Sequence, residues 1–345
     1  MVGPIAIAAG GTGGHVFPAR AFAACLAARS ETAIAVTDRR GTAFAGDAPV
    51  YTIRAGSPRS PSGLMQLGLG VFDARRVLAK TCSRAVVGFG GYPSAPTVLA
   101  ARWLGLTTVL HEQNAVLGRT NRVLARGRVK IAAGYPGLGD RLVGNPVRAE
   151  IAALRERAYV PPAPSEPLRL LVFGGSQGAR LFSEILPAAL GPLAGRVALH
   201  QQCRAEDLEV AREAYRRQGV EARLEPFIED MANALGMAHL VIARAGASTV
   251  AELSAAGRPA ILVPYPHATD DHQSANARAV VEAGGGWLLQ DRDFTPDRLR
   301  QLVETCLAEP GQLAQAAAAA RCFGRPDAAG ALVDFVLSQM REATP

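Results

Sequence analysis

At 345 residues, 49% of them hydrophobic, the chain exceeds the size that one core usually supports, so we expect two domains. It has no apolar run of the roughly 20 residues that a membrane span needs, no leader peptide is apparent, and its five cysteines form no CxxC pair. These features disfavour an integral membrane or disulfide-bonded protein and predict a cytoplasmic one with reduced thiols.

The net charge of +7 is uneven, because residues 1–148 carry 18 Arg or Lys against 6 Asp or Glu, and the remainder carries 19 against 24. The amino-terminal half is therefore expected to meet an anionic surface, either nucleic acid or anionic lipid, although solvated charge is the simpler alternative.

Apolar segments alternate with longer segments of helical period, which is typical of parallel sheets. In the first half we expect strands at Ile5–Ala8, Ala33–Val36, Ala85–Val87, Thr107–Leu110 and Lys130–Ala132.

The first strand runs into the turn Gly10-Gly11-Thr12-Gly13-Gly14, and His15 lies at its tip. Such a turn before a helix offers N–H groups to an anion, although a tight turn alone would also explain the glycines. Histidine can take a proton near neutral pH, so His15 is a candidate base, with a backbone hydrogen bond at the helix start as the alternative.

The segment His111-Glu112-Gln113-Asn114 ends the fourth expected strand. It resembles the start of a zinc-protease motif, but Ala115 stands where a second histidine is needed. We therefore expect its polar side chains to line a cleft.

Tyr159–Pro167 contains four prolines and predicts a stiff, extended linker. The predicted domains are 1–150 and 168–326, joined by a linker at 151–167, with a helix at 327–341 crossing back onto the first domain. In the second half we expect strands at Arg169–Phe173, Val197–His200, Ala222–Glu225, Leu240–Ala243 and Ala260–Val263.

A second glycine turn, Gly174–Gly178, follows the first strand of the second half. Neither turn has the spacing of the dinucleotide fingerprint, and GxxxxGK[ST] is absent, which disfavours an NAD-dependent oxidoreductase and a P-loop protein. Two such turns predict two α/β domains with phosphate chemistry in a cleft between them.

A third strand–helix junction is Arg244–Glu252. Thr249 and Glu252 fit a capping box, and Gly257 fits the end of the same helix. Alternatively, the helix N-terminus faces a diphosphate, Glu252 accepts from ribose hydroxyls and Arg244 adds positive charge.

The segment 267–276 offers Asp270 and Asp271 beside a histidine, which could suggest a metal, but we favour helix capping for the two carboxylates. Gln273 and Asn276 are three residues apart on one helical face and suit sugar hydroxyls. Asp291-Arg292-Asp293 has the acidic spacing of metal-dependent nucleotide-sugar enzymes, but it stands in a turn where a solvated loop is expected.

Together these motifs resemble those of the MurG family of bacterial N-acetylglucosaminyltransferases. They run in order over about three quarters of the chain: GGTGGHVFPA at 10–19, GFGGYPS at 88–94, HEQN at 111–114, GNPVR at 144–148, GGSQGAR at 174–180, FIEDM at 227–231, RAGASTVAE at 244–252 and DDHQSANA at 270–277.

The resemblance implies an α/β protein of GT-B glycosyltransferase architecture, with two Rossmann-like domains and a cleft between them. It implies inverting transfer of N-acetylglucosamine from UDP-N-acetylglucosamine to the C4 hydroxyl of the muramyl sugar of lipid I. The product is lipid II, with a β-1,4 linkage, in peptidoglycan synthesis. Oriented N–H groups and an arginine can stabilise a leaving diphosphate, so we expect neither a metal nor another cofactor.

By position, the resemblance places Arg148 and Ile228 beside the uracil and Glu252 at the ribose, with Gln273 and Asn276 at the donor sugar. The diphosphate would be lined by Ser176, Arg244, Ala247 and Thr249. Donor contacts are also implied for Thr12, Gly13, Gly14 and Asn114. The acceptor pyrophosphate would face Gly10, Gly11, Thr12, Gly13, Gly14, Gly90, Gly91 and Tyr92. His15, as the base, and Asn114 would lie at the reacting hydroxyl.

The implied acceptor has a long polyprenyl tail, so the protein must reach the cytoplasmic face of the inner membrane without spanning it. Apolar residues beside basic ones suit docking on anionic lipid, and buried core is the alternative for each apolar residue. The candidate docking residues are Leu64, Met65, Leu67, Leu69, Val71, Phe72, Arg75, Arg76, Lys80 and Trp103. No nucleic-acid partner is expected, and other cell-wall synthesis proteins are conceivable partners.

Two segments depart from the family pattern: 37–42 is short, and 201–204 lacks the small residue and glycine that are common there. One alternative function is a UDP-N-acetylglucosamine 2-epimerase of the same architecture, which would not explain the basic first half. The other is a non-catalytic lipid- or nucleic-acid-binding module, against which His15, Asn114, Glu252 and Gln273 argue.

Overall fold

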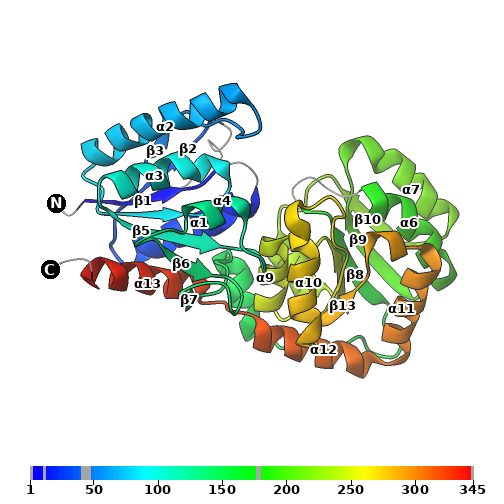
Figure 1. Ribbon diagram of the computed structural model, residues 1–345. Coiled ribbons are helices and arrows are strands. Elements are labelled where there is room, and N and C mark those ends of the chain that lie inside the picture. The colour runs from blue at the N-terminus through cyan, green and yellow to red at the C-terminus, as the bar shows by residue number, and fades with distance from the viewer. Residues whose placement is uncertain (1–2, 11–12, 40–47, 176–179, 343–345) are drawn as a thin grey trace. The chain divides into compact units, whose positions relative to one another are not determined.

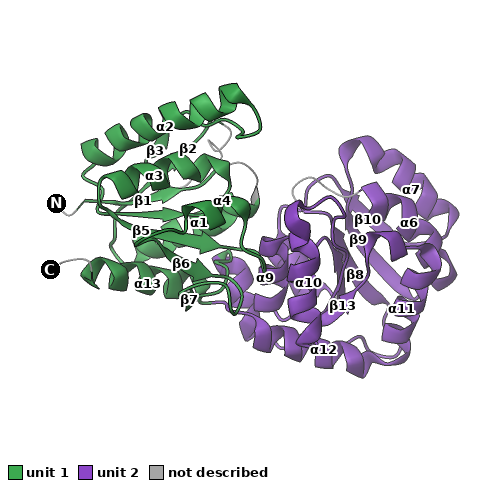
Figure 2. Ribbon diagram, in the orientation of Figure 1, with its two compact units in different colours: residues 1–148, 327–345 green, residues 149–326 purple. Residues whose placement is uncertain are grey.

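A computed structural model describes residues 3–10, 13–39, 48–175 and 180–342. The chain forms two compact units (Figures 1 and 2). Unit 1 consists of residues 1–148 and 327–345, and unit 2 of residues 149–326. Both units contain a parallel sheet with helices packed on it.

The described residues of unit 1 form a sheet of strand order β3-β2-β1-β4-β5-β6-β7 (Figure 1). Its strands are β1 (Ile5–Ala8), β2 (Ala33–Thr37), β3 (Val50–Thr52), β4 (Ala85–Gly88), β5 (Thr107–Glu112), β6 (Lys130–Ala133) and β7 (Arg141–Leu142). Its helices are α1 (Gly13–Ala28), α2 (Pro61–Lys80), α3 (Ala95–Trp103), α4 (Arg119–Leu124) and α13 (Ala328–Glu342).

Helices cover both faces of this sheet, which explains why the central strands β1 and β4 are apolar and buried at every position instead of alternating with polar residues. On one face, Ile7 of β1 packs in a core with Phe22 of α1 and Leu332 of α13. On the other face, Ala8 of β1 lies in a core with Leu78 of α2. The carboxy-terminal helix α13 is thus part of the core of unit 1.

Unit 2 has the strand order β10-β9-β8-β11-β12-β13 in its described residues. Its strands are β8 (Leu168–Phe173), β9 (Val197–Gln202), β10 (Ala222–Glu225), β11 (Leu240–Ala243), β12 (Ala260–Leu262) and β13 (Gly286–Leu288). Its helices are α5 (Ala149–Ala152), α6 (Arg180–Leu190), α7 (Leu208–Arg217), α8 (Met231–Met237), α9 (Ala247–Ala255), α10 (His272–Glu282), α11 (Pro296–Ala308) and α12 (Pro310–Phe323). Phe182 of α6, Tyr215 of α7 and Leu299 of α11 belong to one buried core with β8 and β9.

The chain passes between the units at Arg148 and Ala149. The segment expected to be a linker is packed on unit 2, because Ile151 of α5 and Leu154 are buried. Further along it, the Tyr159 hydroxyl donates to the His239 carbonyl over 2.8 Å. Residues 158–163, which include the first prolines, lie outside helices and strands. This stretch, for which the sequence predicts a stiff, extended linker, therefore contacts other residues of unit 2.

Candidate active site

The glycine turns lie where strand order reverses. In unit 1 the order changes direction between β1 and β4, and in unit 2 between β8 and β11. The connections that leave the carboxyl ends of two such strands go to opposite sides, which leaves room for a ligand. The switch point of each unit is therefore a candidate ligand position.

In unit 1, close packing at this point requires Gly10. A Cβ atom there would lie 2.7 Å from the Cβ of Pro93 and 3.2 Å from side-chain oxygens of Thr37 and Asp38. The structure thus gives Gly10 a packing role. Gly11, predicted to contact the acceptor, and Thr12, predicted to contact both substrates, lie outside the described residues.

Gly90 and Gly91 follow β4 and have φ angles of +81° and +70°, a region that favours glycine. Tyr92 then begins a short 3₁₀ helix, Tyr92–Ser94. A Cβ at Gly91 would lie 3.4 Å from Nε2 of His15, which is in the first turn of α1. The structure therefore brings together His15 and the second glycine turn, which the sequence separates by 75 residues or so.

A chain of hydrogen bonds runs from His15 into the unit. Its Nδ1 lies 3.3 Å from the amide oxygen of Gln113. The Gln113 amide nitrogen donates to the Phe89 carbonyl at 2.8 Å and to Nδ1 of His111 at 3.1 Å. His111 in turn donates from Nε2 to the Gly144 carbonyl at 2.9 Å. Complete burial lowers the pKa of His111 to about 4, so this ring is neutral at neutral pH.

Glu112 organises the loop that carries Asn114. One carboxylate oxygen accepts from the Asn114 backbone at 3.0 Å and from its side-chain amide at 3.3 Å. The other accepts from the Gly118 N–H at 2.9 Å and from the Asn121 side chain at 2.8 Å. Asn145 fixes the same loop from another segment by donating to the Gln113 carbonyl at 2.9 Å. Of the HEQN residues, only Asn114 is not fully buried.

Sequence reasoning did not assign roles to Gln113, Glu112 or Asn145 individually. The signal for them was present in the HEQN and GNPVR motifs. Their partners, however, lie up to 98 residues away along the chain, a distance at which no local pattern reveals a contact.

In unit 2, helix α9 begins directly after β11 at the switch point. Its N-cap is Gly246, with no side-chain cap. The capping-box interpretation of Thr249 and Glu252 is therefore wrong, because the helix starts three residues earlier than that motif requires. Both side chains are half-buried on the first turns of α9, and Ala247 is its first residue. The end of the helix is as predicted, with Gly257 at φ +61° and bonds from Gly257 and Arg258 back to Ser254 and Leu253.

Arg244, the residue after β11, is fixed by hydrogen bonds to two backbone carbonyls and by an ion pair. Its guanidinium donates to the carbonyls of Val263 and Pro264 at 3.3 and 3.1 Å, and it forms an ion pair with Asp291 at 2.5 Å. The expectation that Asp291 lies in a merely solvated loop is therefore wrong. Asp291 anchors Arg244 across 47 residues of sequence, and the guanidinium also lies 5.6 Å from the Tyr265 ring.

Gln273 and Asn276 of α10 brace the neighbouring loops. Gln273 accepts from the Tyr265 N–H at 2.9 Å, and Asn276 donates to the Ala245 carbonyl at 3.1 Å. Gln273 is half-buried, whereas Asn276 has no exposed surface. Asn276 thus holds the segment before α9 and offers no surface to a sugar hydroxyl in this structure.

Of the two carboxylates before α10, Asp271 does not cap it. Asp271 occupies the N-cap position in the left-handed region, but its side chain accepts no capping bond and pairs with Arg278 at 3.4 Å. The expected capping role is therefore wrong for Asp271. Within the described residues, no group of three or more His, Cys, Asp or Glu side chains is arranged to hold a metal ion.

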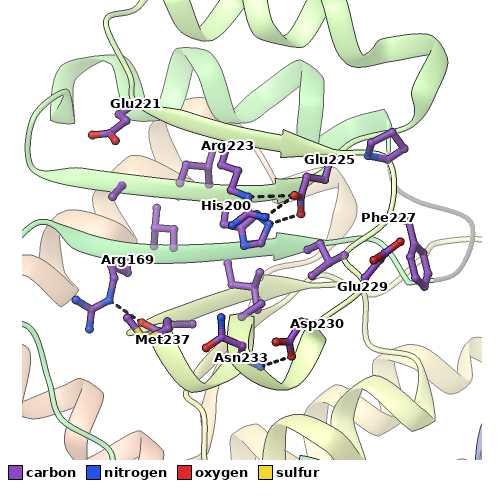
Figure 3. Close-up of a pocket in the computed structure, with 18 residues that line it drawn as sticks. Arg169, His200, Glu221, Arg223, Glu225, Phe227, Glu229, Asp230, Asn233 and Met237 are labelled. Carbon is purple, nitrogen blue, oxygen red and sulfur yellow. Dashed lines mark hydrogen bonds and ion pairs between the residues drawn. The ribbon is translucent and has the colours of Figure 1, made fainter.

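A hollow of about 630 Å³ lies on unit 2 between α8 and the strands β8, β9 and β10 (Figure 3). His200 and Arg223 bond the Glu225 carboxylate at 2.8 and 2.5 Å and hold its pKa below the ordinary value. Of the predicted donor-binding residues that the structure describes, only Ile228 lines this hollow. The hollow is lined by residues from the amino-terminal half of β8. It is therefore distinct from the switch point of unit 2, which lies at the carboxyl end of this strand.

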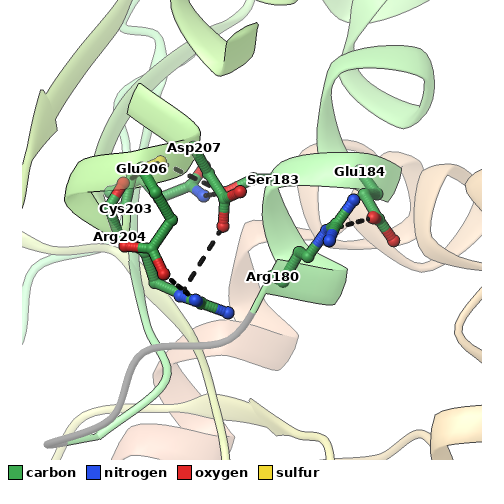
Figure 4. Close-up of polar contacts among 8 residues, drawn as sticks. Arg180, Ser183, Glu184, Cys203, Arg204, Glu206 and Asp207 are labelled. Atoms are coloured by element: carbon green, nitrogen blue, oxygen red, sulfur yellow. Dashed lines mark hydrogen bonds and ion pairs between the residues drawn. The ribbon is translucent and has the colours of Figure 1, made fainter. Parts of the chain in front are cut away.

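The divergent segment 201–204 ends β9 on the carboxyl edge of the sheet. Cys203 is buried, 3.3 Å from the Ser183 hydroxyl, and burial raises the pKa of its thiol. Arg204 is paired with Glu206 and lies 3.8 Å from Asp207 (Figure 4). The other divergent segment has Thr37 and Asp38 buried, while 40–42 lie outside the described residues, as does Ser176.

The predicted docking residues lie on α2 and α3 of unit 1. Leu64, Met65, Phe72 and Trp103 are 52–60% exposed, whereas Leu67, Leu69 and Val71 are partly buried. Phe72 meets Trp103 edge to face at 5.7 Å, and the Arg75 guanidinium lies 4.9 Å from the Trp103 ring.

Arg76 and Lys80 are exposed further along α2, and Leu99, which sequence reasoning missed, is exposed one turn before Trp103. We call Leu64, Met65, Phe72, Leu99 and Trp103 the α2–α3 apolar patch. In the part of the chain that the structure describes, no helix is long and apolar enough to cross a membrane.

Arg148 is the last residue of unit 1 before the chain enters unit 2. It is half-buried, and its guanidinium lies 5.7 Å from the ring of Phe17 on α1.

Comparison with known proteins defines the class. Residues 5–133 match the glycosyltransferase family 28 N-terminal domain, and residues 169–332 match the C-terminal domain of the same family. Two parallel α/β units with these matches are the two domains of a GT-B glycosyltransferase, as expected.

The relatives narrow this class. Proteins of Rhodospirillum centenum and Paramagnetospirillum magneticum, 50% and 48% identical to this chain, are both named UDP-N-acetylglucosamine--N-acetylmuramyl-(pentapeptide) pyrophosphoryl-undecaprenol N-acetylglucosamine transferase. The matches cover 97% and 96% of this chain and 94% and 96% of the relatives. The crystal structure of Acinetobacter baumannii MurG is similar with a TM-score of 0.81 at 34% identity, over 97% of this chain and 99% of that one. The chain belongs to this family of N-acetylglucosaminyltransferases. Membership of this family argues against the two alternative functions, an epimerase and a non-catalytic binding module.

Proposed function

We propose that this glycosyltransferase moves N-acetylglucosamine from UDP-N-acetylglucosamine to the C4 hydroxyl of the muramyl sugar of lipid I and so forms lipid II. The family supplies the reaction. The observation that carries the proposal within this chain is the histidine at the unit 1 switch point, with its Nδ1 bonded to Gln113 and its Nε2 beside Gly91.

In this reaction the C4 hydroxyl oxygen attacks the anomeric carbon of the donor sugar, and the bond from that carbon to the diphosphate breaks. Attack opposite the leaving group inverts the anomeric centre and gives a β-1,4 linkage. His15 takes the hydroxyl proton through Nε2, and UDP leaves with the bonding electrons.

The leaving diphosphate gains charge as this bond breaks. In unit 2, α9 begins at the switch point with an N-cap that has no side chain, so its first N–H groups can face an anion. We assign Ala247 and Thr249 to this end of the helix and Glu252 to the ribose hydroxyls. Arg244 adds a fixed positive charge beside it. The roles of Ile228 and Arg148 at the uracil and of Gln273 at the sugar rest on the family resemblance.

The acceptor's polyprenyl tail requires a membrane surface, and the α2–α3 apolar patch is suited to meet it. Four large apolar side chains more than half exposed, next to Arg75, Arg76 and Lys80, are the arrangement that binds an anionic lipid interface. We propose peripheral docking through this patch at the cytoplasmic face of the inner membrane.

A double variant tests the docking. Phe72→Glu with Trp103→Glu should weaken binding to vesicles of phosphatidylglycerol and phosphatidylethanolamine by about tenfold or more, because it removes two inserted rings and adds repulsion from anionic lipid. Vesicle co-sedimentation measures the loss. Val210→Glu on unit 2 is the matched control, since Val210 is 73% exposed outside the patch. Equal binding by the double variant and wild type would contradict the docking surface.

Transfer itself is tested with radiolabelled UDP-N-acetylglucosamine and a lipid I analogue, with and without EDTA. We expect label in the lipid product at a rate that EDTA does not change, because α9 and Arg244 supply the charge that a metal would otherwise provide. Loss of label on adding EDTA would overturn the metal-independent mechanism. Isomerised UDP-sugar without labelled lipid would overturn the transferase assignment.

A further inference from the structure

Two main-chain carbonyls determine the direction of the hydrogen bonds around Gln113. The carbonyl of Phe89 can only accept, so the Gln113 atom 2.8 Å from it must be the NH₂ group. The carbonyl of Gly144 can only accept as well, so Nε2 of His111 carries a hydrogen toward it. The neutral His111 ring then has a bare Nδ1, which accepts the second Gln113 N–H at 3.1 Å.

These assignments leave one arrangement for His15. With the NH₂ group used by Phe89 and His111, the Gln113 oxygen faces Nδ1 of His15. That oxygen can only accept, so Nδ1 carries the hydrogen. In a neutral imidazole the other nitrogen, Nε2, then holds the lone pair.

We propose that Gln113 is a positioning residue that fixes the tautomer of His15, with Phe89, His111 and Gly144 fixing Gln113 in turn. The amide oxygen keeps the hydrogen on Nδ1 and makes Nε2 the basic nitrogen. Gly90 and Gly91 complete the arrangement, because their lack of side chains preserves the space beside the ring.

The positioning role of Gln113 is supported by its burial as well as by the direction of its hydrogen bonds. Gln113 is 2% exposed, and rotation of its side-chain amide would break the buried hydrogen bonds to the Phe89 carbonyl and to Nδ1 of His111. The chemistry is that of an orienting group behind a general base, with a neutral amide in the place often taken by a carboxylate.

This inference rests on the proposed function in one respect, namely that Nε2 of His15 is the base. The first readout is therefore independent of turnover. In protein labelled with ¹⁵N-histidine, the nitrogen shifts of His15 distinguish a bare Nε2 from a protonated one, and His15→Gln identifies its signals among the six histidines. We expect bare Nε2 in the wild type and a mixture of tautomers in Gln113→Met, which keeps the side-chain volume but removes the amide.

The second readout is the pH profile of kcat. Gln113→Met should lower kcat by about 10- to 100-fold, because part of the population presents the wrong nitrogen. Gln113→Glu places a carboxylate at Nδ1 and stabilises the protonated ring, so the acid limb of kcat should move to higher pH by about one unit. A residue that only supported the loop would leave that limb in place.

Asn145→Ala is the matched control, because it removes the bond to the Gln113 backbone and leaves the amide–imidazole contact intact. It should lower the thermal midpoint without changing the His15 tautomer or the acid limb. An unchanged His15 tautomer in both Gln113 variants would overturn the inference. If His15→Ala retained near-normal turnover while the tautomer still depended on Gln113, the proposed base would fail and the positioning contact would stand.

Discussion

His15→Ala should lower kcat for sugar transfer by about 10²- to 10⁴-fold, the usual contribution of a general base. The variant removes the proposed acceptor of the hydroxyl proton, while the helix end and Arg244 that we assign to the leaving group lie in unit 2 and are unchanged. The KM for UDP-N-acetylglucosamine should therefore change little. Steady-state transfer at saturating lipid acceptor separates the two parameters.

The matched control for this experiment is His200→Ala. His200 lies in the unit 2 hollow, bonded to Glu225, away from both switch points. We expect it to keep kcat within about twofold, with a thermal midpoint no higher than that of His15→Ala. A His15→Ala enzyme that retained more than about a tenth of wild-type kcat would rule out His15 as the base.

The strands and the positions of the glycine turns could be read from the sequence because buried parallel strands are apolar on both faces. Ile5–Ala8 and Leu240–Ala243 are predicted and observed with the same bounds. Short edge strands escaped notice: β3, β7 and β13 have two or three residues, too few for a pattern, and their side chains are only partly buried. Their pairing depends on neighbours that local sequence does not specify.

The candidate site likewise contains residues that the sequence predicted and residues that it did not. Motifs located His15 and Arg244 because Arg244 directly follows one predicted strand and His15 lies at the tip of the glycine turn after another. The residues that hold them, Gln113 and Asp291, were passed over or misread because the contacts join segments 98 and 47 residues apart. The capping-box interpretation was wrong for a local reason. β11 ends at Ala243, Gly246 is the N-cap, and helix α9 therefore begins before Thr249.

The unit 1 site also depends on a buried carboxylate, and Glu112→Gln should destabilise the protein by about 3 kcal/mol. Each Glu112 oxygen accepts two hydrogen bonds. Glutamine keeps one such oxygen and turns an NH₂ group toward the other pair of donors, which leaves buried N–H groups unsatisfied at about 1–3 kcal/mol each. For a unit of this size the thermal midpoint should fall by about 6–12 °C.

Activity should fall with stability, because the new NH₂ group faces either the two Asn114 donors or the donors of Gly118 and Asn121, and the loss of either pair loosens the loop that carries Asn114. Calorimetry or circular dichroism gives the midpoint, and transfer assays below it give kcat. Glu304→Gln makes the same chemical change at an exposed position of α11 and should cost no more than about 0.5 kcal/mol. If Glu112→Gln matched Glu304→Gln in both midpoint and kcat, the loop that presents Asn114 would have to be held by Asn145 and the strand end alone. The same comparison measures how much of the catalytic geometry in unit 1 this buried carboxylate maintains.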